Sequence, residues 1–130
     1  MTLDTTVKLT ISLIDPELNA EELDQETQQL WIELNQLEAV ERVERVADPN
    51  PPEGNKAFGG VLLGMLQAEA TVPNGLKVLR FLGDRFKGKS TTIEISGEVK
   101  GKKFKIKVGS SEELPVALEA YEKAMKMINS

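Results

Sequence analysis

The 130-residue sequence contains no histidine and no cysteine, and these two absences restrict its chemistry more than any motif does. A Ser/His/Asp or Cys/His nucleophile, a thiol redox centre and the usual zinc sites all require imidazole or thiolate side chains. Carboxylates, amines, guanidinium groups and hydroxyls remain for catalysis. The sequence therefore favours a protein that works by contact, and we expect no enzymatic activity, no cofactor and no metal site.

A secretory signal is also missing from the sequence as given. Its first residues, MTLDTTVKLTISLID, include an early acidic side chain and alternate in polarity, with no basic start and no continuous apolar block. The lack of cysteine suits the cytoplasm. With 40% hydrophobic and 28% charged residues, the chain has the composition of a globular protein. We expect one cytoplasmic domain over residues 1–130.

The formal net charge of −5 is unevenly distributed along the chain. Residues 1–76 contain 4 basic and 14 acidic side chains, whereas residues 77–107 contain 10 basic and 3 acidic ones. A segregated positive segment of this kind can meet phosphate, an acidic lipid surface or an acidic partner. It can equally neutralise the protein's own acidic first helix.

Alternating polarity predicts strands with one buried face. Residues 7–13, 91–96 and 103–108 each alternate with a period of two, and the last two flank a turn expected at residues 97–101. The β-branched segment around Val43 favours a further short strand, before a proline-rich loop at residues 48–55. Because the alternating strands each have a polar face, we expect helices on one side of the sheet.

Helix signals fall in three regions outside the central apolar segment. Asn19 and Glu22 have the spacing of a capping box, which predicts an amphipathic helix over about residues 20–38. A second amphipathic helix is expected from Leu76 to Phe86, and a last one begins after Ser110. The first strand, first helix and second strand form a natural parallel crossover.

Residues 57–68, AFGGVLLGMLQA, contain no charge and predict a helix that is apolar on every side. Such a helix is too short to span a bilayer, which needs about 20 residues. Gly60, Gly64 and Ala68 would give it a smooth ridge, and Pro73 to Gly75 would end it. The helix is either core or an interface, and its candidate interface residues are Phe58, Val61, Leu62, Met65 and Leu66.

The complete pattern predicts an α+β fold, a two-layer sandwich with a four-stranded mixed sheet and helices packed on one face. The expected order is β-α-β-α-α-β-β-α.

A row of lysines forms the most distinctive polar feature. Alternate residues of a strand line one face about 7 Å apart, which is close to phosphate spacing. Phe104 points to the other face, so no aromatic side chain is near for base stacking. The row is therefore a candidate anion-binding site or a solvated, edge-protecting face. Its residues are Lys100, Lys102, Lys103, Lys105 and Lys107.

Other polar pairs carry less information. Glu21–Glu22 and Glu112–Glu113 stand at expected helix starts, where the helix dipole explains them. Asp48 and Asn50 are followed by prolines and lack the glutamate of a calcium loop. The segment FGGVLLG lacks the pattern of a phosphate-binding loop.

Taken in order, these segments resemble the effector-associated constant component family over nearly the whole chain. The similar segments are LTISLIDPELNAEELDQETQQLWIELNQL, the V-E-R-V strand, the Pro-rich loop into KAFGGVLLGML, LKVLRFLGDRF, STTIEISGE and the terminal SSEEL helix. The resemblance implies a small, non-enzymatic component of bacterial conflict systems, encoded beside or fused to effectors such as caspase-like or trypsin-like peptidases. It supplies no active-site residues.

We therefore expect an adaptor, a non-catalytic module for protein–protein interaction with a partner such as a peptidase-type effector. Two alternatives stay open, namely binding of nucleic acid or an anionic surface through residues 100–107, and a structural homodimer. The missing aromatics argue against nucleic acid, and the short apolar segment allows a peripheral membrane contact at most.

Overall fold

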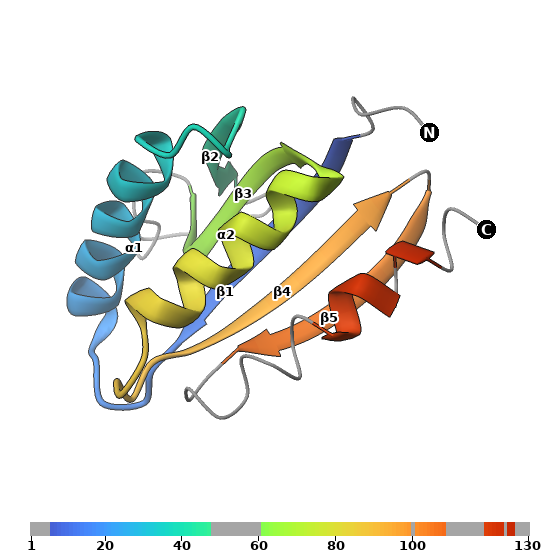
Figure 1. Ribbon diagram of the computed structural model, residues 1–130. Helices are drawn as coiled ribbons and strands as arrows, with labels where there is room; N and C mark the ends of the chain where they lie inside the picture. The colour runs from blue at the N-terminus through green and yellow to red at the C-terminus, as the bar shows by residue number, and fades with distance from the viewer. Residues whose placement is uncertain (1–5, 48–60, 100, 109–118, 124, 127–130) are drawn as a thin grey trace.

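The computed structural model describes residues 6–47, 61–99, 101–108, 119–123 and 125–126, which form a five-stranded antiparallel sheet with helices on one face (Figure 1). In chain order its elements are β1 (Thr6–Ile14), α1 (Ala20–Asn35), β2 (Arg42–Ala47), β3 (Val61–Thr71), α2 (Val72–Arg85), β4 (Thr92–Val99) and β5 (Lys102–Val108). Residues 119–123 and 125–126 are helical as well.

The strands lie in the order β2-β3-β1-β4-β5, and every neighbouring pair is antiparallel. Because β1 and β2 are both antiparallel to β3, they run parallel to each other with β3 between them. The prediction of an α+β sheet with one covered face is confirmed. The prediction of four strands in a mixed sheet is wrong, since β3 is a fifth strand inserted into the β1-α1-β2 crossover.

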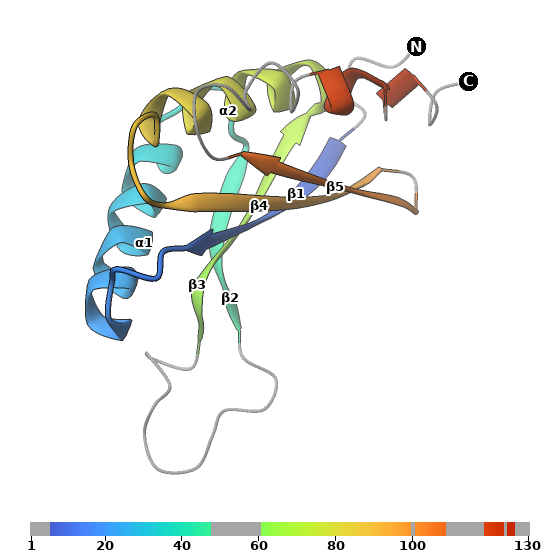
Figure 2. The same ribbon diagram turned by 90° about the horizontal axis from the view of Figure 1, so that it is seen from below.

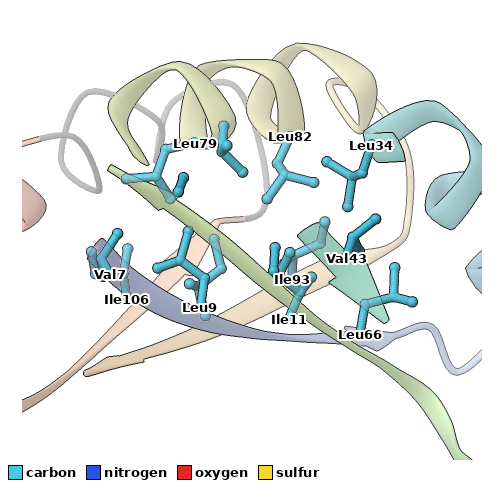
Figure 3. Packing of buried hydrophobic residues seen from close by; sticks show 14 of the residues in the cluster. Val7, Leu9, Ile11, Leu34, Val43, Leu66, Leu79, Leu82, Ile93 and Ile106 are labelled. Carbon is cyan, nitrogen blue, oxygen red and sulfur yellow. The ribbon is translucent and has the colours of Figure 1, made fainter. Parts of the chain in front are cut away.

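The core lies between the sheet and the helices. Leu9 and Ile11 of β1 are fully buried, and Leu79 and Leu82 of α2 point toward them (Figure 3). The alternation that predicted the strands therefore places their apolar side chains under the helical layer. Figure 2 shows this layer on one side of the sheet, with no described helix on the other.

The described part of the charge-free segment is a strand, which corrects the expected helix over residues 57–68. Residues 57–60 lie outside the described part of the chain, and β3 begins at Val61. Leu66 and Ala68 face the core, whereas Gln67 between them is exposed. A short apolar run is compatible with a buried strand as well as with a buried helix. In the structure this segment forms a strand because it pairs with both β1 and β2.

Gly64 produces an irregularity in β3. Its φ of 75° lies in the left-handed region that glycine adopts without strain. The β2–β3 register shifts here, from Arg45 opposite Leu66 to Ala47 opposite Val61. A bulge of this kind bends a strand. In Figure 2 the ends of β2 and β3 that lie beyond this irregularity extend away from α2, on the side of the sheet where α1 lies.

Helix α2 begins before the residues that were expected to stop a helix. Thr71 is its N-cap, with Oγ1 accepting from the Asn74 N–H at 3.4 Å, and Pro73 lies in the first turn, where no backbone donor is needed. Gly75 follows in the same turn. The expected stop at residues 73–75 is therefore wrong. Proline is common both in the first turn of a helix and just after the end of one, so its presence does not show which of the two a segment is.

The remaining predictions agree with the structure more closely. The capping box is present, with Asn19 Oδ1 accepting from the Glu22 N–H at 2.8 Å and Glu22 Oε1 accepting from the Asn19 N–H at 2.9 Å. The β4–β5 hairpin is also confirmed, although Gly97 lies inside β4 and not in the turn. The predicted loop at residues 48–55 and the start of the last helix lie outside the described residues.

Candidate binding surface

The face of the sheet opposite the helices, called the outer face below, is formed by the alternate residues that the core does not use. On the central strand β1 these are Lys8, Thr10 and Ser12, whose neighbours Leu9 and Ile11 are buried. Their register partners extend the face over the other strands. The partners are Met65, Gln67 and Glu69 of β3, Glu94, Ser96 and Glu98 of β4, and beyond these Arg42, Glu44, Lys103, Lys105 and Lys107.

The outer face is hollowed where β1, β3, β4 and β5 meet. An open cavity of about 610 Å³ lies here. Thr10, Gln67 and Ser96 supply hydroxyl and amide groups that can donate or accept hydrogen bonds. Volumes of this size accommodate small ligands or a few side chains of a partner. The remaining lining residues are Lys8, Gly97, Glu98, Lys103, Phe104 and Lys105.

One end of the outer face is basic. Lys8 lies between Glu69 of β3 and Glu98 of β4, and Glu98 in turn lies opposite Lys103, so lysines and carboxylates alternate across these four strands. Lys105 Nζ approaches Glu94 Oε1 at 3.6 Å, and 69% of the Lys105 side chain is exposed. Within the part of the chain that the structure describes, Lys8 and Lys103 form no ion pair.

The other end of the outer face is apolar. Ile14, at the end of β1, is 44% exposed, and Met65 lies half-buried opposite Ser12. Leu63, beside the bulge at Gly64, is 37% exposed. Exposed apolar side chains therefore lie on the same face of the sheet as the lysines and glutamates, and Met65 lies in one register row with Glu94 and Lys107.

The five predicted interface residues do not share one surface. Leu66 is fully buried in the core, whereas its neighbour Met65 belongs to the outer face. Val61 and Leu62 are in β3, but their side chains, like the whole of Phe58, lie outside the described structure. Met65 is thus the predicted residue for which the structure describes an accessible side chain.

The predicted lysine row is partly gathered on this face. Lys103, Lys105 and Lys107 alternate along β5 on the outer side, and all three are exposed. Lys102 lies opposite Val99, so it belongs to the other side of the sheet, and Lys100 is outside the described residues. Strand alternation predicted the shared face of Lys103, Lys105 and Lys107 and the opposite direction of Phe104, but the inclusion of Lys102 in the row is wrong, since its partner Val99 is buried in the core.

Sequence reasoning missed Lys8, Thr10 and Gln67 as neighbours of the lysine row. The alternation of β1 placed Lys8 and Thr10 on a polar face. Which strands neighbour β1 could not be inferred, because β3 was expected to be a helix. Sheet order is a long-range property, and nothing local in these strands encodes it.

The two edges of the sheet differ. At the β2 edge, Trp31 Nε1 of α1 donates to the Val43 carbonyl at 3.1 Å, and Arg45 bonds to Asp24 and Gln28 of the same helix. At the opposite edge, β5 carries exposed lysines. Both arrangements reduce unwanted strand pairing, so the edge-protecting interpretation of the lysine row retains its physical basis.

Two carboxylates with lowered pKa values, Asp15 and Glu33, take part in contacts within the fold. A hydrogen bond from the Glu17 N–H, with others from Thr91 and Ser90, holds the pKa of Asp15 below its ordinary value. Burial opposes ionisation of Glu33, but hydrogen bonds from Arg85 and Gln29 lower its pKa overall. These residues lie outside the cavity lining, so their pKa values give no sign of catalysis on the outer face.

The described residues contain no cluster of three or more acidic side chains suited to a metal ion. Of the two glutamate pairs considered, Glu22 takes part in the capping box beside exposed Glu21, whereas Glu112 and Glu113, like Asp48 and Asn50, are not described. No helix in the described ranges combines the length and apolarity that crossing a membrane requires.

The fold and its outer face define a small α+β domain with one sheet face covered by helices and one that the described helices leave uncovered. Comparison of the chain with protein-family models, curated proteins and solved structures finds no match.

Proposed function

We propose that this protein is a non-catalytic adaptor that binds a protein partner through the outer face of its sheet. The observation that carries the proposal is the cavity of about 610 Å³ on a sheet face that the described helices leave uncovered. An open, hollowed face with both charged and apolar side chains offers orientation and buried area to a partner.

The chemistry of the chain supports the same function. Histidine and cysteine are absent from the whole sequence, and the groups lining the cavity are lysines, hydroxyls, an amide and one carboxylate. Among the described residues that line the cavity, Glu98 is the one carboxylate, and an acid–base pair would need a second. Binding is thus the function that this surface supports best.

The resemblance to effector-associated constant components favours an effector, such as a peptidase, as the partner in a bacterial conflict system. The proposed contact differs from the one expected from sequence. Leu66 is buried in the core, so we place the proposed interface on the outer face, to which Met65 belongs.

The experiment is affinity capture of the full-length protein from the cells that encode it, comparing wild type with Thr10→Trp. Thr10 lies on the central strand and lines the cavity, so an indole there fills the hollow without changing net charge. We expect a partner that wild type retains to be lost with Thr10→Trp. Gln25→Trp, on the exposed side of α1, is the matched control and should retain it.

Circular dichroism of both variants checks that the fold is intact. Retention of every wild-type partner by a folded Thr10→Trp protein would refute the outer face as the interface. Loss of the partner with Gln25→Trp alone would place the interface on α1 instead.

A further inference from the structure

The basic end of the outer face contrasts with the rest of this acidic protein. The chain has a formal net charge of −5, yet Lys8, Lys103, Lys105 and Lys107 project from β1 and β5 on the same side of the sheet. Three of these four lysines line the cavity. Lys103, Lys105 and Lys107 come from β5 alone, and folding adds Lys8 from a strand almost a hundred residues earlier in the chain.

We propose that this basic end, Lys8, Lys103, Lys105 and Lys107, binds a short acidic segment of the partner polypeptide in extended conformation. The inference rests on the proposed adaptor function and adds the chemistry of the partner. The proposed partner segment is rich in Glu or Asp, and its acidic side chains alternate with neutral ones.

The spacing of the lysines suits such a segment. Alternate residues of β5 lie about 7 Å apart, which is also the repeat of side chains on one face of an extended chain. Lys8 lies across β4 from this row, two strand spacings or about 10 Å away. An extended segment whose alternate acidic side chains face β5 would therefore meet this row of lysines, while Lys8 lies on the opposite side of the segment.

The lysines are available for a partner's carboxylates. Among the described residues Lys8, Lys103 and Lys107 form no ion pair, and Lys105 has one loose contact of 3.6 Å with Glu94. An exposed pair of this kind contributes about 0–1 kcal/mol, so exchanging it for a partner's carboxylate costs little. Thr10 and Ser96 in the cavity can in addition bond to the segment's backbone.

The same surface suits nucleic acid less well. Phe104 faces the helical side, where its ring packs edge-on against Tyr121 with the centroids 5.7 Å apart, so it is not free to stack on a base. Glu94 and Glu98 interrupt the positive charge along β4. A phosphate backbone presents a negative charge at every nucleotide and would meet both carboxylates, whereas a polypeptide can place neutral residues against them.

The test measures fluorescence anisotropy of three labelled probes with the full-length protein at low ionic strength. The probes are a ten-residue peptide alternating Glu and Thr, the corresponding Lys and Thr peptide, and a ten-nucleotide oligo-dT. We expect the acidic peptide to bind and the basic peptide not to bind. Binding of oligo-dT without the acidic peptide would overturn the proposal in favour of a nucleic-acid surface.

Charge-reversal variants locate the binding site. Lys103→Glu/Lys105→Glu should weaken the Kd for the acidic peptide by at least about tenfold, since close charge pairs then become repulsive. Lys77→Glu/Lys87→Glu changes the net charge equally at exposed positions outside the outer face, and should weaken the Kd by less than about twofold. Equal weakening by both variants, or no binding of the acidic peptide by wild type, would overturn the inference.

Partner capture separates this inference from the adaptor function on which it rests. If Thr10→Trp removes the cellular partner while Lys103→Glu/Lys105→Glu retains it, the outer face is the interface but the acidic-segment inference is wrong. If both variants lose the partner, the inference is supported. If both retain it, the adaptor proposal and the inference both fail.

Discussion

At the residue scale, Asp15 shows how a single carboxylate joins distant parts of the chain. It follows β1 and accepts hydrogen bonds from the Ser90 and Thr91 hydroxyls at 2.9 and 2.8 Å, and from the Glu17 N–H at 2.9 Å. Each donor favours the ionised carboxylate. The turn after β1 is thereby attached to the segment that leads into β4.

The lowered pKa of Asp15 predicts a specific pH dependence of stability. Because the folded protein favours the carboxylate, its stabilising effect is fully present above the ordinary value of 3.8 and is lost as pH falls through the folded pKa. Wild type should therefore exceed Asp15→Asn in unfolding free energy at pH 7, and the difference should shrink below about pH 4. Urea unfolding followed by Trp31 fluorescence measures it.

Glu17→Gln is the matched control, since it removes an exposed carboxylate and keeps the backbone N–H that Asp15 uses. Its difference from wild type should vary less with pH. A difference between wild type and Asp15→Asn that stays constant from pH 7 to pH 3 would contradict the prediction.

At the element scale, polar contacts and close packing decide how the helices sit on the sheet. Arg85, near the end of α2, bonds to Glu33 Oε1 at 2.7 Å and Glu26 Oε1 at 2.8 Å, which ties α2 to α1. Tyr121 of the last helical segment donates its hydroxyl to the Val72 carbonyl at 2.7 Å. The Tyr121 ring reaches this carbonyl because Gly75 leaves space for it.

Gly75→Ala should release the last helical segment from α2. A Cβ at this position would collide with the Tyr121 hydroxyl, and overpacking of this kind costs about 1–3 kcal/mol. We expect lower stability in urea and faster amide hydrogen exchange over residues 119–126. Mass spectrometry of the exchanged protein measures the second effect.

Gly88→Ala provides the comparison for this substitution. Gly88 has a φ of 75°, so alanine there adds backbone strain, but nothing lies within 4 Å of its would-be Cβ. Stability should fall by about 1–2 kcal/mol while exchange over residues 119–126 relative to the rest of the protein stays unchanged. Unchanged relative exchange in Gly75→Ala would show that Tyr121 accommodates the methyl group.

At the scale of the whole molecule, the two faces of one sheet have different tasks. The helices cover one face and create the core, and the described helices leave uncovered the other face, which we propose as the binding surface. Two successive residues of β3 lie on different faces, because Leu66 is fully buried in the core and Met65 belongs to the outer face. The same division applies along the central strand β1.

This division predicts that neighbouring substitutions act on different properties. Leu66→Ala should cost about 2–5 kcal/mol of unfolding free energy, since it leaves a cavity in the core. Met65→Ala should cost about 1 kcal/mol or less, yet weaken capture of the partner. Urea unfolding and affinity capture of both variants check this. Equal stability losses would contradict the assignment of the two faces.

The sequence by itself determined the class of fold and much of its local structure. The capping box at Asn19, the alternation of β1 and the β4–β5 hairpin are local patterns, formed by residues a few positions apart, and each is present, although the hairpin's strands extend further into the predicted turn. The absence of histidine and cysteine likewise needs no structure to limit the chemistry.

Tertiary structure decided the identity of β3, the sheet order and hence the candidate surface. An apolar run beside Gly64 has no local signal that separates a buried helix from a buried strand, and pairing with β1 and β2 settles it. Lys8 lies on the same face as Lys103 and Lys105, with β4 between them, because hydrogen bonds between distant strands determine the order of the strands in the sheet. Long-range pairing, which no short stretch of sequence encodes, brings the basic end of the outer face together.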